Sequence, residues 1–135
     1  MQAYTFKKEE RLKSRTLIDQ MFTDGQSFAV YPLRLVWIKT DALKSEYPVQ
    51  FALTVAKKKF PKAAHRNRLR RRIREAWRLN KHQLYRKLNK PEGQYAFMII
   101  YSGKEELPFV IIEAAMQKII YRFQKKIRAN QKDRE

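Results

Sequence analysis

Cysteine is absent from this sequence of 135 residues, and glycine occurs only three times. Without cysteine, the chain can form no disulfide and offers no thiolate to a reaction or to a metal. Three scattered glycines cannot build the glycine-rich loop with which nucleotide hydrolases hold phosphate groups. These absences exclude disulfide-stabilised proteins, thiol enzymes and P-loop enzymes.

Long apolar runs are absent too. The longest clearly apolar stretch is 96–101, whereas a transmembrane helix needs roughly 18 or more apolar residues. The N-terminal sequence MQAYTFKKEERLK contains no apolar core of signal-peptide length. The length suits one domain, and 44% hydrophobic residues suffice for a core. We therefore expect a single-domain, cytoplasmic protein.

Acidic residues are few. The chain has 13 of them against 31 lysines and arginines, which gives a formal net charge of +18. A compact body with that charge is destabilised by its own repulsion unless a polyanion neutralises it. Nucleic acid is the first candidate for that polyanion, and an anionic membrane surface is the second.

The same scarcity argues against catalysis by the protein itself. A protein nuclease needs a cluster of metal-binding carboxylates or a histidine acid–base pair. The adjacent acids Glu9-Glu10 and Glu105-Glu106 lie in polar segments, where we expect them to be solvated. His65 and His82 are 17 positions apart, and we expect both at the surface. We therefore predict no catalytic residue and no metal ligand in this chain, so any chemistry belongs to a partner.

Hydrophobic periodicity predicts an α+β protein, a single-domain α/β sandwich with one mixed sheet. The predicted elements are a helix over 14–24, strands over 28–38 (with a further strand optional) and 49–56, a helix over about 63–89, a strand over 94–101 and a helix over about 108–128. Residues 1–13 read as a flexible basic lead-in, 14–128 as the domain, and 129–135 as a basic tail; we expect the chain to fray from Lys125 onward.

Local signals set the predicted boundaries. Ser14 or Thr16 can cap the first helix, and Asp24-Gly25 ends it. Residues 41–48 read as a loop, and Pro91-Glu92-Gly93 ends the long helix. In the strand 49–56, large residues alternate with a second face of small and mildly polar ones: Gln50, Ala52, Thr54 and Ala56. Such a face allows a ligand to approach the sheet closely.

The long helix carries an unusual concentration of arginine. Residues 64–78 contain seven arginines, no lysine and one acid, Glu75. A solvated helix face normally mixes both signs of charge, and arginine is the side chain that binds phosphate through two parallel hydrogen bonds. With Leu69, Ile73 and Ala76 toward the sheet, the outward face carries Asn67, Arg71, Arg74 and Arg78, flanked by Arg66, Arg68, Arg70 and Arg72. We interpret this face as a phosphate-binding surface; Asn67 is either a local cap or an RNA contact.

The segment RNRLRRRIRE (66–75) resembles the arginine motif RNRxxRxxRE of the bacterial ribonuclease P protein subunit. LTVAKKK (53–59) is similar to that family's strand ending in V-S-K-K, and ERLKSRTLIDQMFTDGQSF (10–28) resembles its N-terminal helix. The resemblance covers about residues 10–128. It implies a ribonucleoprotein endonuclease that removes the 5′ leader from precursor tRNA. It also implies that the RNA subunit is the catalyst, using Mg²⁺, and that the fold has a left-handed β-α-β crossover.

The resemblance assigns two sets of site residues. Those that bind the RNA subunit are Arg66, Asn67, Arg68, Arg70, Arg71 and Arg74, with Arg78 extending the same face. Those of a cleft for the single-stranded leader, between the first helix and the sheet, are Ile18, Phe22, Thr54, Lys57, Lys58 and Lys59.

Three points in the leader cleft stay open. Ile18 stands where the family often has phenylalanine, which weakens base stacking worth roughly 1–3 kcal/mol per base, and Phe28 or Tyr31 could compensate. The connection KKKFPKAAH lacks the family's Gly-Asn and is one residue longer, so the alignment of the three lysines is open by one position. Phe22 is equally consistent with a core residue.

Two other classes of protein share part of this pattern. A general RNA-binding or ribosome-associated protein would have similar charge, although not the motif and the small strand face. A membrane-surface protein would need bulky apolar residues facing lipid, and here the sheet contact uses them. We expect the RNA subunit and precursor tRNA as partners, no membrane, and a monomer in isolation.

Overall fold

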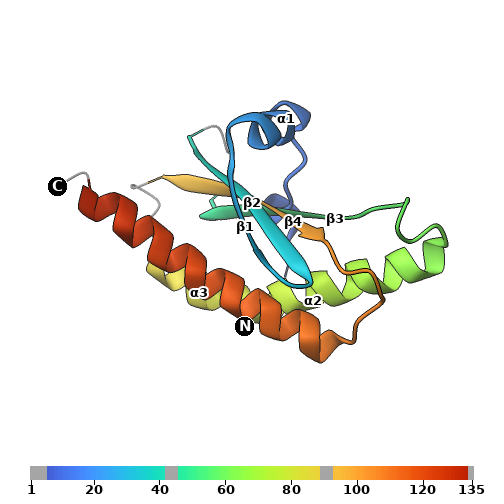
Figure 1. The fold of residues 1–135 in the computed structure, drawn as a ribbon. Coiled ribbons are helices and arrows are strands. Elements are labelled where there is room, and N and C mark those ends of the chain that lie inside the picture. The colour runs from blue at the N-terminus through green and yellow to red at the C-terminus, as the bar shows by residue number, and fades with distance from the viewer. Residues whose placement is uncertain (1–5, 42–45, 89–92, 134–135) are drawn as a thin grey trace.

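The computed structural model describes residues 6–41, 46–88 and 93–133 and has three layers. A four-stranded sheet lies between the short helix α1 (Arg15–Asp24) on one face and two long helices, α2 (Ala63–Lys87) and α3 (Phe109–Asp133), on the other (Figure 1). This arrangement confirms the predicted α+β sandwich with a mixed sheet.

The strands are β1 (Gln26–Val30), β2 (Leu33–Thr40), β3 (Val49–Val55) and β4 (Gln94–Tyr101), in the spatial order β1-β2-β4-β3. β1 with β2 and β2 with β4 are antiparallel, whereas β3 and β4 are parallel. Parallel neighbours need a crossover connection, and α2 supplies it. The left-handed sense of that crossover stays a prediction of the resemblance.

Helix α1 begins and ends at the predicted signals. The Ser14 hydroxyl accepts a hydrogen bond from the Leu17 N–H at 3.2 Å, so Ser14 rather than Thr16 is the cap. Gly25 follows the last turn, where a Cβ would lie 2.2 Å from the Met21 carbonyl oxygen. Only glycine therefore lets the chain pass directly from α1 into β1.

The stretch predicted as one strand over 28–38 forms a tight hairpin. β1 and β2 meet at Tyr31-Pro32, which is a cis peptide. The prediction allowed for a further strand but did not place the turn, because Pro32 is also compatible with a strand start.

The two long helices differ from prediction mainly at their ends. α2 ends at Lys87. Pro91 and Glu92 of the expected stop lie outside the described residues, as do residues 42–45 of the expected loop 41–48. The chain was expected to fray from Lys125 onward, whereas α3 continues to Asp133.

The main core lies between the sheet and the pair α2–α3. Its centre is aromatic: Trp77 of α2 stacks on Phe51 of β3 with ring centroids 4.6 Å apart, and Phe123 of α3 packs edge-on against Phe97 of β4. A smaller cluster fills the space between α1 and the other face of the sheet, formed by Leu12, Leu17, Met21, Val36, Ala96 and Met98. The main core holds β3 against α2, and the smaller cluster holds α1 against the sheet.

The N-terminal lead-in was expected to be flexible, and for residues 6–13 this is wrong. Leu12 is buried and its N–H donates to the Phe51 carbonyl at 2.9 Å, which extends the sheet beside β3. Glu10, only 1% exposed, forms a buried ion pair with Lys81 of α2 and accepts a hydrogen bond from the Tyr85 hydroxyl at 2.7 Å. The N-terminal segment therefore forms a wall beside β3.

Candidate RNA interface

Helix α2 is oriented by its buried stripe. Leu69, Ile73 and Ala76 are fully buried against the sheet. Because side chains three and four positions apart share a helix face, this burial turns Asn67, Arg71 and Arg74 outward, and all three are exposed. The predicted arginine face therefore exists as a surface.

Only part of the arginine cluster is free to bind a ligand. Arg71 and Arg74 form no hydrogen bond or ion pair with any residue that the structure describes. Arg70 reaches only the Asn67 side-chain oxygen, at 3.3 Å. These three guanidinium groups keep their donors and charge available for phosphate.

The other arginines are engaged within the protein. Arg66 donates to the carbonyls of Phe60 and Pro61, each at 2.8 Å, and so fastens the connection that leads into α2. Arg78 is paired with Glu75 one turn earlier, and this contact lowers the pKa of the Glu75 carboxyl. Substituting either arginine would therefore change local structure as well as charge.

Glu106 organises the first turns of α2. Its two carboxylate oxygens share the single Nε–H of Arg68, each at 3.1 Å. One oxygen lies 2.9 Å from His65 Nδ1 and the other 3.3 Å from Arg72 Nη1. The hydrogen bonds from Arg68 and His65 lower the pKa of this carboxyl to about 2. The expectation that Glu106 is solvated was wrong, because its partners lie nearly forty residues away in the sequence.

A cleft joins the arginine face to the sheet. Its volume is about 290 Å³, and its walls are the N-terminal segment, β3 and α2. The residues that line it are Phe6, Arg11, Leu12, Lys13, Phe51, Ala52, Leu53, Arg70 and Arg74. Four of these side chains are cationic and none is acidic, so the cleft favours a chain of phosphates.

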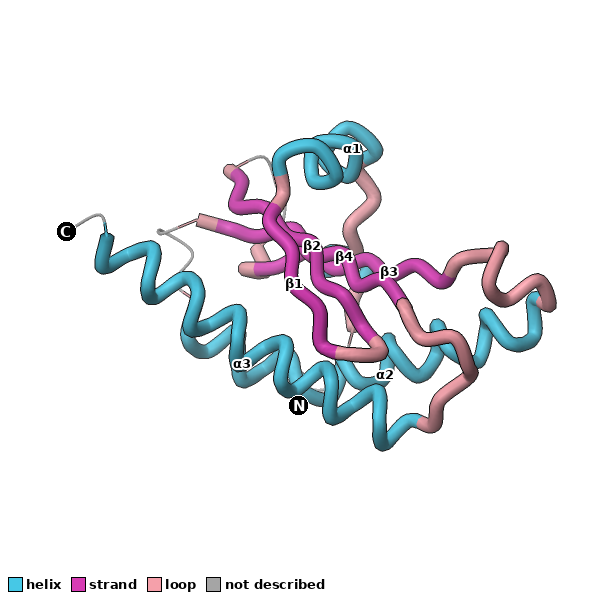
Figure 2. Tube along the Cα trace, in the orientation of Figure 1, coloured by secondary structure: helices cyan, strands magenta, loops and turns pink. Residues whose placement is uncertain are grey.

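The predicted leader-site residues occupy the side of the sheet that α1 covers. Phe22, on the last turns of α1, is 57% exposed, so the core interpretation of this ring is wrong. Ile18 is half-buried against the small cluster under α1. Thr54 of β3 is half-buried, and Lys57, Lys58 and Lys59 are exposed. A loop follows β3 and leads into α2 (Figure 2). None of these six side chains lines the 290 Å³ cleft itself.

Sequence reasoning missed Arg34 on this face. In the sheet register Arg34 of β2 and Thr54 of β3 both pair with Ile100 of β4, so the three side chains form one row. Arg34 also donates to the Ser27 hydroxyl at 3.2 Å. The available signal was a charge within the alternating stretch LRLVWI. Arg11 and Lys13 were missed as well, because their segment was expected to be flexible.

Phe28 does not compensate for Ile18. It pairs with Leu35 in the hairpin and packs against the main core, on the α3 side of the sheet. Arg122 and Lys126 of α3 lie over its ring, at 5.9 and 5.5 Å from the centroid. Tyr31 is exposed at the hairpin turn, and its role stays open.

Within residues 6–41, 46–88 and 93–133, no three histidine, cysteine or acidic side chains group together in a way that could hold a metal ion. Over the same ranges, no helix is both long and apolar enough to cross a bilayer.

Most of the described chain matches known proteins. The Ribonuclease P family model matches residues 6–124. A ribonuclease P protein component of Porphyromonas gingivalis is 43% identical over 121 residues, covering 85% of this chain and 83% of the relative. One from Chlorobium phaeobacteroides is 41% identical over 83 residues, which cover 60% of this chain and 57% of the relative.

Solved structures agree on the fold. The RNase P protein from Thermotoga maritima superposes with a TM-score of 0.65 at 22% identity, covering 84% of this chain and 96% of that one. The Staphylococcus aureus RNase P protein gives a TM-score of 0.66 at 16% identity, covering 86% and 95%. Because the family model matches most of the chain, this chain belongs to the ribonuclease P protein family.

Proposed function

We propose that this chain is the protein subunit of ribonuclease P, which assists a catalytic RNA in removing the 5′ leader from precursor tRNA. One observation carries the proposal: Arg70 and Arg74 belong to the free arginines of α2 and also line the cleft. An RNA bound along the arginine face of α2 would thus lie directly beside an RNA strand held at β3.

The chemistry belongs to the RNA subunit in this proposal. Hydrolysis of a phosphodiester at neutral pH generally uses metal-bound water or a positioned acid–base pair. Since the described residues provide no trio of metal-binding side chains, this chain does not fit a resident Mg²⁺ ion. We therefore assign Mg²⁺ to the RNA and assign binding and alignment to the protein.

The two surfaces divide the binding. Arg70, Arg71 and Arg74 contact phosphates of the RNA subunit, a type of contact that dominates nucleic-acid affinity. The precursor leader lies along the small face of β3, with its backbone near Thr54 and Arg34 and a base stacked on Phe22. Stacking and phosphate contacts tolerate any base, so this site reads the presence of a leader rather than its sequence.

A reconstitution assay tests the proposal. The protein is added to a bacterial ribonuclease P RNA at low Mg²⁺, where phosphate repulsion is least screened, and cleavage of precursor tRNA is followed. We expect the protein to restore accurate 5′ maturation and the protein without RNA to cleave nothing. Arg71→Ala/Arg74→Ala should restore less, since it removes two phosphate contacts.

The second candidate, a general RNA-binding protein without a role in tRNA maturation, predicts a different result. Such a protein would bind the same RNA through its net charge of +18 yet leave leader cleavage unchanged. In either case, we expect a monomer before RNA binds and a cytoplasmic location.

A further inference from the structure

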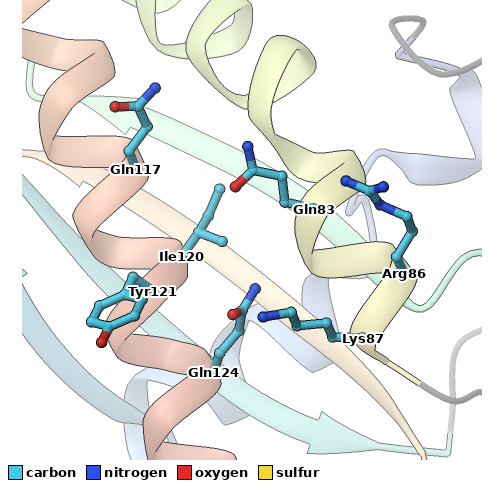
Figure 3. A pocket seen from close by; sticks show the side chains of 7 residues that line it. All are labelled: Gln83, Arg86, Lys87, Gln117, Ile120, Tyr121 and Gln124. Carbon is cyan, nitrogen blue, oxygen red and sulfur yellow. The ribbon is translucent and has the colours of Figure 1, made fainter.

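A second groove lies between the two long helices, in the layer that covers the opposite face of the sheet from α1. Its volume is about 320 Å³, and it shares no residue with the cleft at β3. Gln83, Arg86 and Lys87 of α2 line one wall, and Gln117, Ile120, Tyr121 and Gln124 of α3 line the other (Figure 3). This volume lies at the lower end of the range for small-ligand sites.

The electrostatics of the groove favour an anion. No acidic residue lies in its walls. In the sequence, α2 has no acid after Glu75, and α3 has none between Glu113 and Asp133. Cations in the last turn of a helix are commonly explained by the helix dipole alone, so Arg86 and Lys87 by themselves do not define a site.

The remaining residues of the groove provide an exposed aromatic ring and an apolar floor. The ring of Tyr121 is 58% exposed, an unusual position for a large aromatic side chain, and Lys125 lies 4.9 Å from its centroid. Ile120 is buried and forms an apolar floor. An exposed aromatic ring beside an apolar floor is a surface on which a planar base can stack.

Gln124 is the least expected residue in this groove. Its side chain is 8% exposed, yet no residue that the structure describes forms a hydrogen bond with its amide. Although the residue is largely buried, its amide atoms still reach solvent, so they stay available to a ligand in the groove. In Figure 3 the Gln124 amide and the Lys87 ammonium point toward one another across the groove. An amide can donate to and accept from the edge of a base.

We propose that this groove binds one unpaired nucleotide of the ribonuclease P RNA. The base stacks on Tyr121 and bonds to the Gln124 amide, while its phosphate lies between Arg86 and Lys87. The inference rests on the proposed function and adds to it a second contact with the RNA subunit, distant from the leader site.

The RNA subunit suits the groove better than the precursor does. Arg74, on the arginine face, and Arg86, in the groove, are twelve positions apart on the same helix, or about 18 Å at 1.5 Å per residue. An RNA that already lies along α2 can therefore reach the groove with a few nucleotides. The proposed leader path lies on the other face of the sheet, beside α1.

Two variants test the groove. Tyr121→Ala removes the ring, and we expect the affinity for ribonuclease P RNA to fall roughly 5- to 150-fold, the range for losing one stacked base; Tyr121→Phe should retain most of it. Gln124→Leu should lower the affinity roughly two- to tenfold, in the range of one hydrogen bond, while leaving the melting temperature unchanged or higher. If Gln124 is merely structural, Gln124→Leu should lower the melting temperature and leave the RNA affinity unchanged.

The matched control is Val110→Ala. Val110 lies on the same helix, is 67% exposed, and faces the same side because eleven residues complete about three turns. We expect its affinity to stay within twofold of wild type, as should the affinity of each assembled holoenzyme for precursor tRNA.

Three results would overturn the inference. They are an unchanged RNA affinity for Tyr121→Ala, an equal loss for Val110→Ala, and a loss confined to precursor tRNA, which would make the substrate the occupant. If Arg71→Ala/Arg74→Ala still weakens RNA binding in the same assay, only the groove is wrong; if that variant also binds normally, the proposed function fails as well.

Discussion

The double variant Arg71→Ala/Arg74→Ala gives the sharpest test of the arginine face. Neither guanidinium has a partner among the described residues, and both are exposed, so their removal should leave the fold intact. Each lost phosphate contact should reduce the slope of log K against log salt by roughly 0.7–0.9. Two contacts therefore reduce it by about 1.4–1.8.

That change in slope has a direct consequence for affinity. Between 50 and 200 mM salt, a fourfold range, the wild-type protein should lose about 7 to 12 times more affinity than the variant does. Equilibrium binding of ribonuclease P RNA over this range, with melting temperatures measured in parallel, gives both slopes.

The control removes the same charge from the opposite edge of the sheet. Arg122 donates to the Ala29 carbonyl of β1, whereas the cleft lies at β3, and Lys118 lies one turn earlier on α3. Lys118→Ala/Arg122→Ala should keep the wild-type slope. Equal reductions in both variants would show that net charge rather than a phosphate-binding face holds the RNA. A wild-type slope in Arg71→Ala/Arg74→Ala would show that these two side chains do not contact phosphate.

Three further predictions concern single positions. Because Phe22 is 57% exposed, Phe22→Ala should change the free energy of unfolding by less than about 0.5 kcal/mol, yet weaken holoenzyme binding of precursor tRNA by about 1–3 kcal/mol with mature tRNA unaffected; equal weakening of both would remove Phe22 from the leader site. The folded-state pKa of Glu106, about 2, lies below its ordinary value of 4.5, so its stabilisation is complete above pH 4.5 and is lost as the pH falls toward 2. Glu106→Gln should flatten the decline of melting temperature over that interval, and an unchanged decline would contradict the cluster. Lys81→Met should lower the free energy of unfolding by about 3–5 kcal/mol, because the Glu10 charge stays buried; in urea titrations Glu10→Gln/Lys81→Met should regain much of this, and no recovery would contradict the pairing.

Periodicity predicted the elements whose burial follows a single face. Leu69 and Ile73 of α2 recur at helical spacing and are fully buried, and Phe51 with Val55 alternates along β3. For such elements, local pattern and tertiary packing agree, so the sequence suffices. The arginine face followed for the same reason, since it is the opposite side of a helix whose buried side was known.

Contacts between distant segments were not predictable. Arg34 and Thr54 lie in one row only because β4 pairs with both strands, and no local signal encodes that pairing. Likewise, Glu106 engages Arg68 because the β4–α3 connection folds back onto α2. The sequence alone cannot distinguish an arginine that is engaged in contacts within the protein from one whose guanidinium group stays free.

The buried pair of Glu10 and Lys81 orders events during synthesis of the chain. The two residues are 71 positions apart, so the N-terminal segment has no partner for its carboxylate until most of α2 has left the ribosome. Until then the segment that carries Arg11 and Lys13 lacks the anchor that this ion pair provides, and the cleft wall is incomplete. The cleft can therefore be complete only after Lys81 has been synthesised.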